Sequence, residues 1–217
     1  MKPYILWDFD GTLYRGIKPF TVYSSCILHL LGKEDSGEIG EIERRLRDCN
    51  DFYGNDGYEI VGRYFSTVSS HVMQIAYEQM RETLLQHPEY VEVPEQLRIF
   101  LPKAKERSIM IVASNSPEPY VTPFLEKLNL KNYFPKIISK AAKPEGIIKI
   151  IKELPEDASL LSVGDHYTND IAPALAMGRD AAFISNCIRW NYKATIKGKK
   201  IEDVLPEIDK WIETHII

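Results

Sequence analysis

Two aspartates near the start of the chain, Asp8 and Asp10, stand one residue apart in the segment YILWDFDGTLY. The apolar residues before them predict a buried strand, so both carboxylates follow the end of that strand. Adjacent carboxylates repel each other, and burying them without partners costs on the order of several kcal/mol each. A divalent cation, which binds oxygen ligands, would relieve that cost. The pair therefore indicates a metal site that could take part in catalysis.

A plain turn is the alternative interpretation of DFDG, because Asp side chains often bond to their own backbone and Gly suits turns. An EF-hand calcium loop that began at Asp8 would need an acid at its twelfth position, where the sequence has Pro19. The calcium loop is therefore set aside. The turn and the metal site both stay open on this motif alone.

A second acidic pair, Asp165 and Asp170, lies in the segment SVGDHYTNDI after another apolar run. Pro173 is expected in the first turn of the next helix, so that helix should begin near Asn169 or Asp170. Asp165 then lies on the loop between strand and helix, where a structural role is harder to find. Asp170 could be a helix cap or a metal ligand, and local sequence does not separate the two.

The segment IVASNSP ends a predicted strand with Ser114 and Asn115, and Pro117 then opens a helix. Hydroxyl, amide and backbone N–H groups at the start of a helix can hold a phosphate group. Ser and Asn before a proline are also common in ordinary turns, so the segment is a candidate phosphate site and no more.

One lysine, Lys143, directly precedes Pro144 at the expected start of a helix. Most lysines are solvated surface charges. This one is expected at the edge of the sheet that also carries the acids, where it could neutralise a phosphate or a carboxylate. Lys140 is the competing candidate for the same role.

The elements that must position these residues follow an alternating order. Short β-type runs, each followed by a helical pattern, cover residues 108–114, 136–139, 159–165 and 181–185, and a last helix covers 201–215. This order predicts βαβ units and a Rossmann-like, doubly wound, mostly parallel sheet. In such a sheet, ligands bind beyond the carboxyl ends of the strands, where all the candidate residues fall.

The region between the first strand and this alternation differs in character. Residues 16–91 contain amphipathic helical patterns, such as FTVYSSCILHLLG and SSHVMQIAYEQMRETLL, and no convincing strand. We therefore predict an α/β core formed by residues 1–15 and 92–217, interrupted by a helical insertion formed by residues 16–91.

The bulk composition is that of an ordinary globular protein, with 217 residues, 44% of them apolar. A net charge of -4, without any run of basic residues, argues against binding to nucleic acid. No apolar stretch approaches the ~20 residues of a membrane span, and the first apolar run is too short for a signal peptide. Cys26, Cys49 and Cys187 are widely spaced and predict reduced thiols. We expect a cytoplasmic monomer or homodimer that binds neither nucleic acid nor membrane.

The ordered segments DFDGT, ASN, KP and GDHYTND together resemble the haloacid dehalogenase (HAD) superfamily, specifically its phosphohydrolase branch. The resemblance covers residues 4–14 and 95–186. It implies a HAD core, and it implies that the insertion is a helical cap domain of type C1. His166 departs from the small residue that the family pattern has after the first Asp of the last motif.

The resemblance implies a role for each acid. Asp8 would be the nucleophile that forms an aspartyl phosphate, and Asp10 the general acid and base. Mg²⁺ would be held by Asp8, the backbone carbonyl of Asp10 and Asp165, with Asp170 bound directly or through a second shell. Dehalogenases of the family lack the acid at the position of Asp10 and the full metal cluster. This sequence has both, which favours a phosphatase.

The remaining candidates would serve the phosphoryl group. Ser114 and the backbone of Asn115 would hold its oxygens, and Lys143 would neutralise charge and position Asp8. Arg15, beside the first motif, could reach a second anionic group of the substrate, although we leave it outside the site.

The sequence thus predicts a Mg²⁺-dependent phosphatase that acts on a small phosphorylated metabolite. A phosphomutase that uses the same aspartyl phosphate is one alternative, and a non-catalytic phosphate-binding protein on the same fold is another. Phosphonate hydrolysis would need a cap lysine that forms a Schiff base, and Lys18 and Lys33 have no recognisable motif around them.

Overall fold

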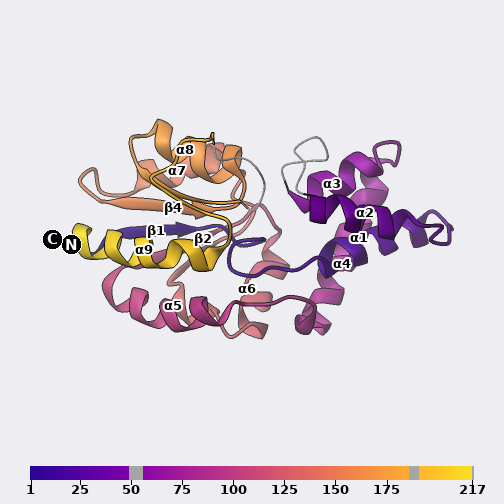
Figure 1. Ribbon diagram of the computed structural model, residues 1–217, viewed down its shortest axis with the longest axis horizontal. Coiled ribbons are helices and arrows are strands. Elements are labelled where there is room, and N and C mark those ends of the chain that lie inside the picture. Colours follow the sequence, from indigo (N-terminus) through magenta and orange to yellow (C-terminus); the bar gives the residue numbers. More distant parts are fainter. Residues whose placement is uncertain (49–55, 186–190, 217) are drawn as a thin grey trace. The chain divides into compact units, whose positions relative to one another are not determined.

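The computed structural model describes residues 1–48, 56–185 and 191–216 (Figure 1). The chain forms two compact units. Unit 1 consists of Met1–Arg15 and Val93–Ile217, and unit 2 consists of Gly16–Glu92. Each unit is described by itself below.

Unit 1 is built on one six-stranded sheet in which every neighbouring pair of strands is parallel. Its strands are β1 (Tyr4–Trp7), β2 (Ile109–Ala113), β3 (Lys136–Ile138), β4 (Leu160–Gly164), β5 (Asp180–Ile184) and β6 (Ile196–Gly198). The strand order is β3-β2-β1-β4-β5-β6. After β1 the chain adds β2 and β3 on one side of it, and then crosses over to add β4, β5 and β6 on the other side. The boundary between β1 and β4 is therefore the topological switch point.

Helices cover both faces of this sheet, as the predicted doubly wound fold requires. They are α5 (Glu95–Arg107), α6 (Glu118–Lys127), α7 (Glu145–Glu153), α8 (Ala172–Ala176) and α9 (Ile201–His215), with short turns η2 (Lys131–Tyr133) and η3 (Tyr167–Ile171). α7 packs on α8, and α5 packs on α9. In Figure 1, α7 and α8 lie on one side of β1 and β4, and α5 lies on the other. The predicted fold class is confirmed.

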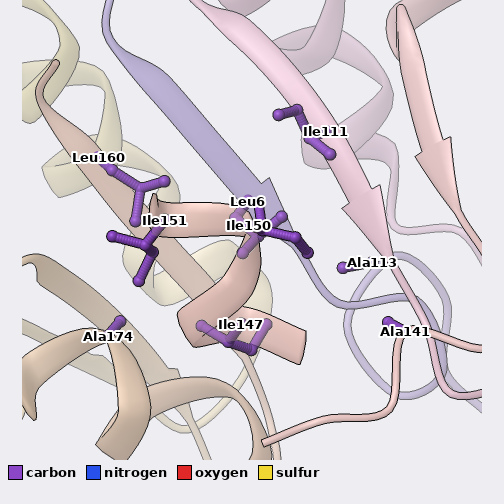
Figure 2. Close-up of a cluster of buried hydrophobic side chains, with 9 residues drawn as sticks. All are labelled: Leu6, Ile111, Ala113, Ala141, Ile147, Ile150, Ile151, Leu160 and Ala174. Atoms are coloured by element: carbon purple, nitrogen blue, oxygen red, sulfur yellow. The ribbon is translucent and has the colours of Figure 1, made fainter. Parts of the chain in front are cut away.

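The core next to the switch point is apolar and close-packed (Figure 2). α7 contributes Ile147, Ile150 and Ile151, whose spacing places them on one face of the helix. They lie in one cluster with Leu6 of β1 and Leu160 of β4. Each fully buried Leu or Ile side chain contributes about 1.5–3 kcal/mol, so this face fixes α7 against the central strands.

The regular elements that the structure describes in unit 2 are all helical. The unit contains α1 (Lys18–Leu30), α2 (Glu38–Asp48), α3 (Gly57–Tyr64), α4 (Ser70–Gln86) and the short turn η1 (Pro88–Tyr90). α1 packs against α2, α3 and α4. Within the described ranges, no helix combines the length and the apolar character that a membrane span needs.

Of the three cysteines that were predicted to be reduced, the structure describes one. Cys26, on α1, is free and partly buried. Cys49 and Cys187 lie outside the described residues.

Candidate active site

Asp8 and Asp165 lie next to each other because their strands are neighbours. β1 ends at Trp7 and β4 ends at Gly164, and Trp7 is in register with Val163. The backbone N–H of Asp8 donates to the carbonyl of Val163 at 2.8 Å, so the pairing extends one residue beyond β1. The switch point therefore brings one acid from each end of the core to the same edge of the sheet.

Asp170 completes a cluster of three acids at this edge. Asp8, Asp165 and Asp170 each offer a carboxylate oxygen, and these oxygens lie within 4.8 Å of one another. Asp170 lies on η3 and is only 1% exposed. Mg²⁺ binds oxygen ligands about 2 Å away and takes one or two carboxylates readily, so the donor set and its spread suit this ion.

Two glycines, Gly11 and Gly164, leave room for the side chains of Asp165 and Asp170 to pack directly against the backbone. Gly11 has a φ of +86°, and a Cβ at that position would lie 2.1 Å from Oδ2 of Asp165. A Cβ at Gly164 would lie 2.4 Å from the Cβ of Asp170. Any larger residue at either position would push an acid out of the cluster.

Lys143 is buried among these acids. Its Nζ donates to Oδ1 of Asp8 and to Oδ1 of Asp170, both at 2.6 Å, and its side chain is 4% exposed. Burial by itself lowers the pKa of Lys143, but the two carboxylates outweigh it and hold that pKa above its usual range. Lys143 is therefore a buried cation, whereas the competing Lys140 is exposed.

The charge of the cluster is not balanced by Lys143 alone. The pKa of Asp8 is raised to about 7, chiefly by burial; Lys143 opposes the rise, and the neighbouring carboxylates of Asp170 and Asp10 add to it. The carboxylates contribute to both pKa shifts, because Asp8 and Asp170 share one ammonium group and negative charge remains in excess. A further cation at this place would lower the pKa of Asp8 and stabilise the cluster.

Asp8 has one more partner that the sequence did not assign. The hydroxyl of Thr12 donates to Oδ2 of Asp8 at 3.0 Å, while Lys143 binds the other oxygen. Thr12 follows in the turn after the strand, four residues from Asp8. Both oxygens of Asp8 therefore have a fixed orientation.

Asp10 is held by two hydroxyl groups. Its Oδ1 accepts a hydrogen bond from the hydroxyl of Tyr14, and its Oδ2 accepts one from Oγ of Ser116 at 2.9 Å. Neither Tyr14 nor Ser116 was a candidate from the sequence. Tyr14 follows Asp10 by four residues, but Ser116 lies 106 residues away, after β2.

Ser114 and Asn115 lie at the carboxyl end of β2, next to β1 in the sheet. The buried Oγ of Ser114 accepts from the backbone N–H of Ser116 at 3.1 Å. Oδ1 of Asn115 accepts from the backbone N–H of Lys143 at 2.8 Å. The Asn115 side chain therefore anchors the backbone at Lys143. Its own backbone was predicted from the sequence to bind the phosphoryl group.

Two residues that the sequence left outside the site have clear contacts. Nδ1 of His166 accepts from the backbone N–H of Asn169 at 3.3 Å, so His166 caps η3, which begins two or three residues before the predicted helix start. Arg15 forms an ion pair with Glu202 of α9 at 2.8 Å.

A protein-family model described as haloacid dehalogenase-like hydrolase matches residues 5–184. The matched range includes every candidate residue of the site. The search of curated proteins found no match.

Solved structures similar to this chain include members with different activities. A HAD phosphatase from Thermococcus onnurineus is 19% identical, with a TM-score of 0.66 over 100% of both chains. A Bacillus subtilis protein described as a HAD hydrolase bound to magnesium is 13% identical, with a TM-score of 0.68 over 96% of this chain and 99% of that one. A 2-haloacid dehalogenase from Pseudomonas syringae is 18% identical, with a TM-score of 0.59 over 97% and 100%. These similarities establish the fold and leave the choice of reaction to the residues of the site.

Proposed function

The chain belongs to the haloacid dehalogenase-like hydrolase family, and from this premise we propose that it is a Mg²⁺-dependent phosphatase of small phosphorylated metabolites. The reaction would proceed through an aspartyl phosphate on Asp8. Hydrolysis of the ester and release of inorganic phosphate would complete the cycle.

The observation that carries this proposal is the cluster of three acids, two of which bind the buried Lys143. Asp8, Asp165 and Asp170 keep an excess of negative charge beside Lys143, and an anionic substrate could not approach it unaided. The family's dehalogenases displace halide and lack such a full cluster. The presence of Asp10 supports the same choice, because an alcohol leaving group needs a proton and a halide does not.

The first step belongs to Asp8 and Asp10. A carboxylate oxygen of Asp8 attacks phosphorus, and the bond from phosphorus to the ester oxygen breaks. Protonated Asp10 gives its proton to that leaving oxygen and becomes a carboxylate. The products of this step are the free alcohol and the aspartyl phosphate.

The second step reverses the role of Asp10. Its carboxylate takes a proton from water, the water oxygen bonds to phosphorus, and the bond to Asp8 breaks. Inorganic phosphate leaves, Asp8 is a carboxylate again, and Asp10 is protonated for the next turnover.

The other residues bind and orient. Ser114 and the backbone N–H of Asn115 are proposed to hold phosphoryl oxygens, and Lys143 to neutralise charge beside Asp8. The ligands for Mg²⁺ would be Asp8, Asp165, Asp170 and the carbonyl of Asp10. When bound, the ion would supply charge neutralisation for the reacting phosphoryl group, and the magnesium-bound Bacillus subtilis relative supports that choice.

Unit 2 is proposed to be a type C1 cap that selects the substrate. It is helical in its described residues and enters the chain between β1 and β2, after the first motif. Since the chemistry is supplied by unit 1, discrimination among metabolites would come from unit 2. The cytoplasmic location and the state as monomer or homodimer stay predictions of the sequence.

The test is hydrolysis of p-nitrophenyl phosphate in the presence of Mg²⁺. Asp8→Asn should lower kcat by at least about 1,000-fold, because it removes the attacking carboxylate. Asp157→Asn, at an exposed aspartate of the same unit, is the matched control and should keep full activity. EDTA should abolish the activity and added Mg²⁺ should restore it.

Three outcomes would contradict the proposal. They are activity that survives in Asp8→Asn, activity that is indifferent to chelation, and absence of any turnover of aryl phosphates. Product analysis with a panel of phosphorylated metabolites separates a phosphatase, which releases inorganic phosphate, from a phosphomutase, which returns the phosphoryl group to a sugar or a similar acceptor.

A further inference from the structure

Asp10 has to keep one position while its charge changes. As a general acid it must point its proton at the leaving oxygen, and in the next step it must take a proton from water at the same place. An unrestrained Asp side chain rotates about two bonds, which would spread the carboxyl group over several positions. The groups that hold this carboxyl are therefore part of the catalytic geometry.

Tyr14 holds Oδ1 of Asp10 and is itself rigidly placed. Its side chain is 3% exposed, and its ring makes edge contacts with Phe9 and Phe124 at centroid distances of 5.1 and 5.3 Å. Phe9 and Phe124 also contact each other, at 6.2 Å. The hydroxyl group therefore stands at the end of a ring that has little freedom to move.

Ser116 holds Oδ2 of Asp10 from a different part of the chain. It is 6% exposed, its backbone N–H donates to Oγ of Ser114, and its carbonyl accepts from the N–H of Lys140 at 2.9 Å. The loop after β2 is thus fixed by its own hydrogen bonds. Since Ser114 is the proposed phosphate ligand, the same loop couples the position of the phosphoryl group to the position of the acid.

We propose that Tyr14 and Ser116 are positioning residues that orient the general acid Asp10 from two sides. This inference rests on the proposed phosphatase function and adds two residues to it. Each hydroxyl donates to a different oxygen of Asp10, so rotation of the carboxyl group would break both hydrogen bonds. Each hydrogen bond still leaves the oxygen a lone pair that can carry the catalytic proton.

The dependence of rate on the leaving group separates this role from a merely structural one. Esters of acidic phenols need little protonation of the leaving oxygen, whereas esters of more basic phenols depend on the general acid. The assay measures kcat/KM with Mg²⁺ for p-nitrophenyl phosphate and for phenyl phosphate, because kcat/KM reports the transfer of the phosphoryl group to Asp8.

Tyr14→Phe and Ser116→Ala should each lower kcat/KM for phenyl phosphate by about 10-fold and for p-nitrophenyl phosphate by about 2-fold. Asp10→Asn defines the full loss, of about 100-fold or more for phenyl phosphate. Tyr14→Phe keeps the aromatic contacts, so it should fold. Tyr133→Phe and Ser108→Ala, at a half-buried tyrosine and a buried serine of unit 1, are the matched controls and should leave both rates unchanged.

The experiment distinguishes failure of the positioning role from failure of the proposed phosphatase function. Equal losses for both esters, or no loss in either variant, would overturn the positioning role while the wild type still acts as a phosphatase. A wild type that hydrolyses neither ester, or an Asp10→Asn variant with unchanged leaving-group dependence, would overturn the assigned chemistry and this inference with it.

Discussion

Replacing Lys143 by methionine would remove the ammonium group that Asp8 and Asp170 share while keeping an unbranched side chain. The Nζ lies 2.6 Å from an oxygen of each acid, and all three side chains are at most 10% exposed. Removing one partner of a buried ion pair costs about 3–5 kcal/mol, because the remaining charge is left unpaired. We expect a loss of that size in the free energy of unfolding, in EDTA and at mildly alkaline pH.

Tryptophan fluorescence during thermal unfolding measures this effect in the correct part of the chain. All three tryptophans, at positions 7, 190 and 211, fall in the sequence range of unit 1, so the signal reports that unit. A domain of this size loses about 2–4 °C in Tm per kcal/mol, which predicts a drop of about 6–20 °C. Saturating Mg²⁺ should make the drop smaller, because the ion neutralises the same carboxylates.

Lys140→Met is the matched control, since Lys140 lies in the same loop and is exposed. It should change Tm little. In an Asp170→Asn background, the penalty of Lys143→Met should shrink, because one of the two carboxylates is then neutral. The reasoning is refuted if the two lysine variants lose the same stability, or if Mg²⁺ leaves the difference between them unchanged.

Three further predictions concern the neighbours of this lysine. Gly11→Ala should weaken Mg²⁺ binding by at least about 10-fold in calorimetric titration, because its Cβ would collide with the carboxylate of Asp165. Asn115→Ala should lower kcat/KM for p-nitrophenyl phosphate by about 10- to 100-fold, because the backbone of Lys143 loses its anchor. Burial raises the pKa of Asp8 from 3.8 to about 7, so the folded protein holds a proton that the unfolded chain releases. The metal-free protein should therefore lose about 4 kcal/mol of unfolding free energy, relative to Asp8→Asn, as pH rises through that window in denaturant titrations.

Each of these predictions has its own control. Gly178 also has a positive φ, of +68°, but no atom lies within 4 Å of its would-be Cβ, so Gly178→Ala should leave Mg²⁺ binding intact. Asn115→Asp keeps the accepting oxygen and should retain more activity than Asn115→Ala. For the pH dependence, parallel stability curves of wild type and Asp8→Asn would contradict a buried, proton-binding Asp8.

Much of the fold followed from local patterns. The strands β2 to β5 were marked by apolar runs bounded by polar residues, and the predicted last helix has the same bounds as α9. β6 was missed because its three residues, Ile196–Gly198, lie among lysines and gain strand structure by pairing with β5. α3 lies within the predicted helical insertion but was not assigned individually; it begins after Asp56, whose side chain caps it by accepting a hydrogen bond from the backbone N–H of Glu59.

The candidate site was predictable where its residues sit at strand ends, and not where tertiary contacts assign the role. Asp8 and Asp165 follow apolar strands, so a parallel sheet brings them together whatever the details of packing. Ser116 resembles any turn serine, and its contact with Asp10 spans 106 residues. Tyr14 resembles a core aromatic residue, and its ring does pack as one. Only the three-dimensional arrangement reveals that both hydroxyl groups meet one carboxylate.

Chemical trapping of the phosphorylated protein tests the central claim most directly. The Asp10→Asn variant, whose aspartyl phosphate should hydrolyse slowly, is mixed with p-nitrophenyl phosphate and Mg²⁺, quenched in acid, reduced with borohydride and mapped by mass spectrometry. The account predicts homoserine at position 8, the reduction product of an aspartyl phosphate, and none when EDTA replaces Mg²⁺. An unmodified Asp8 in a protein that still turns over substrate, or a phosphoryl group trapped on another residue, would contradict it.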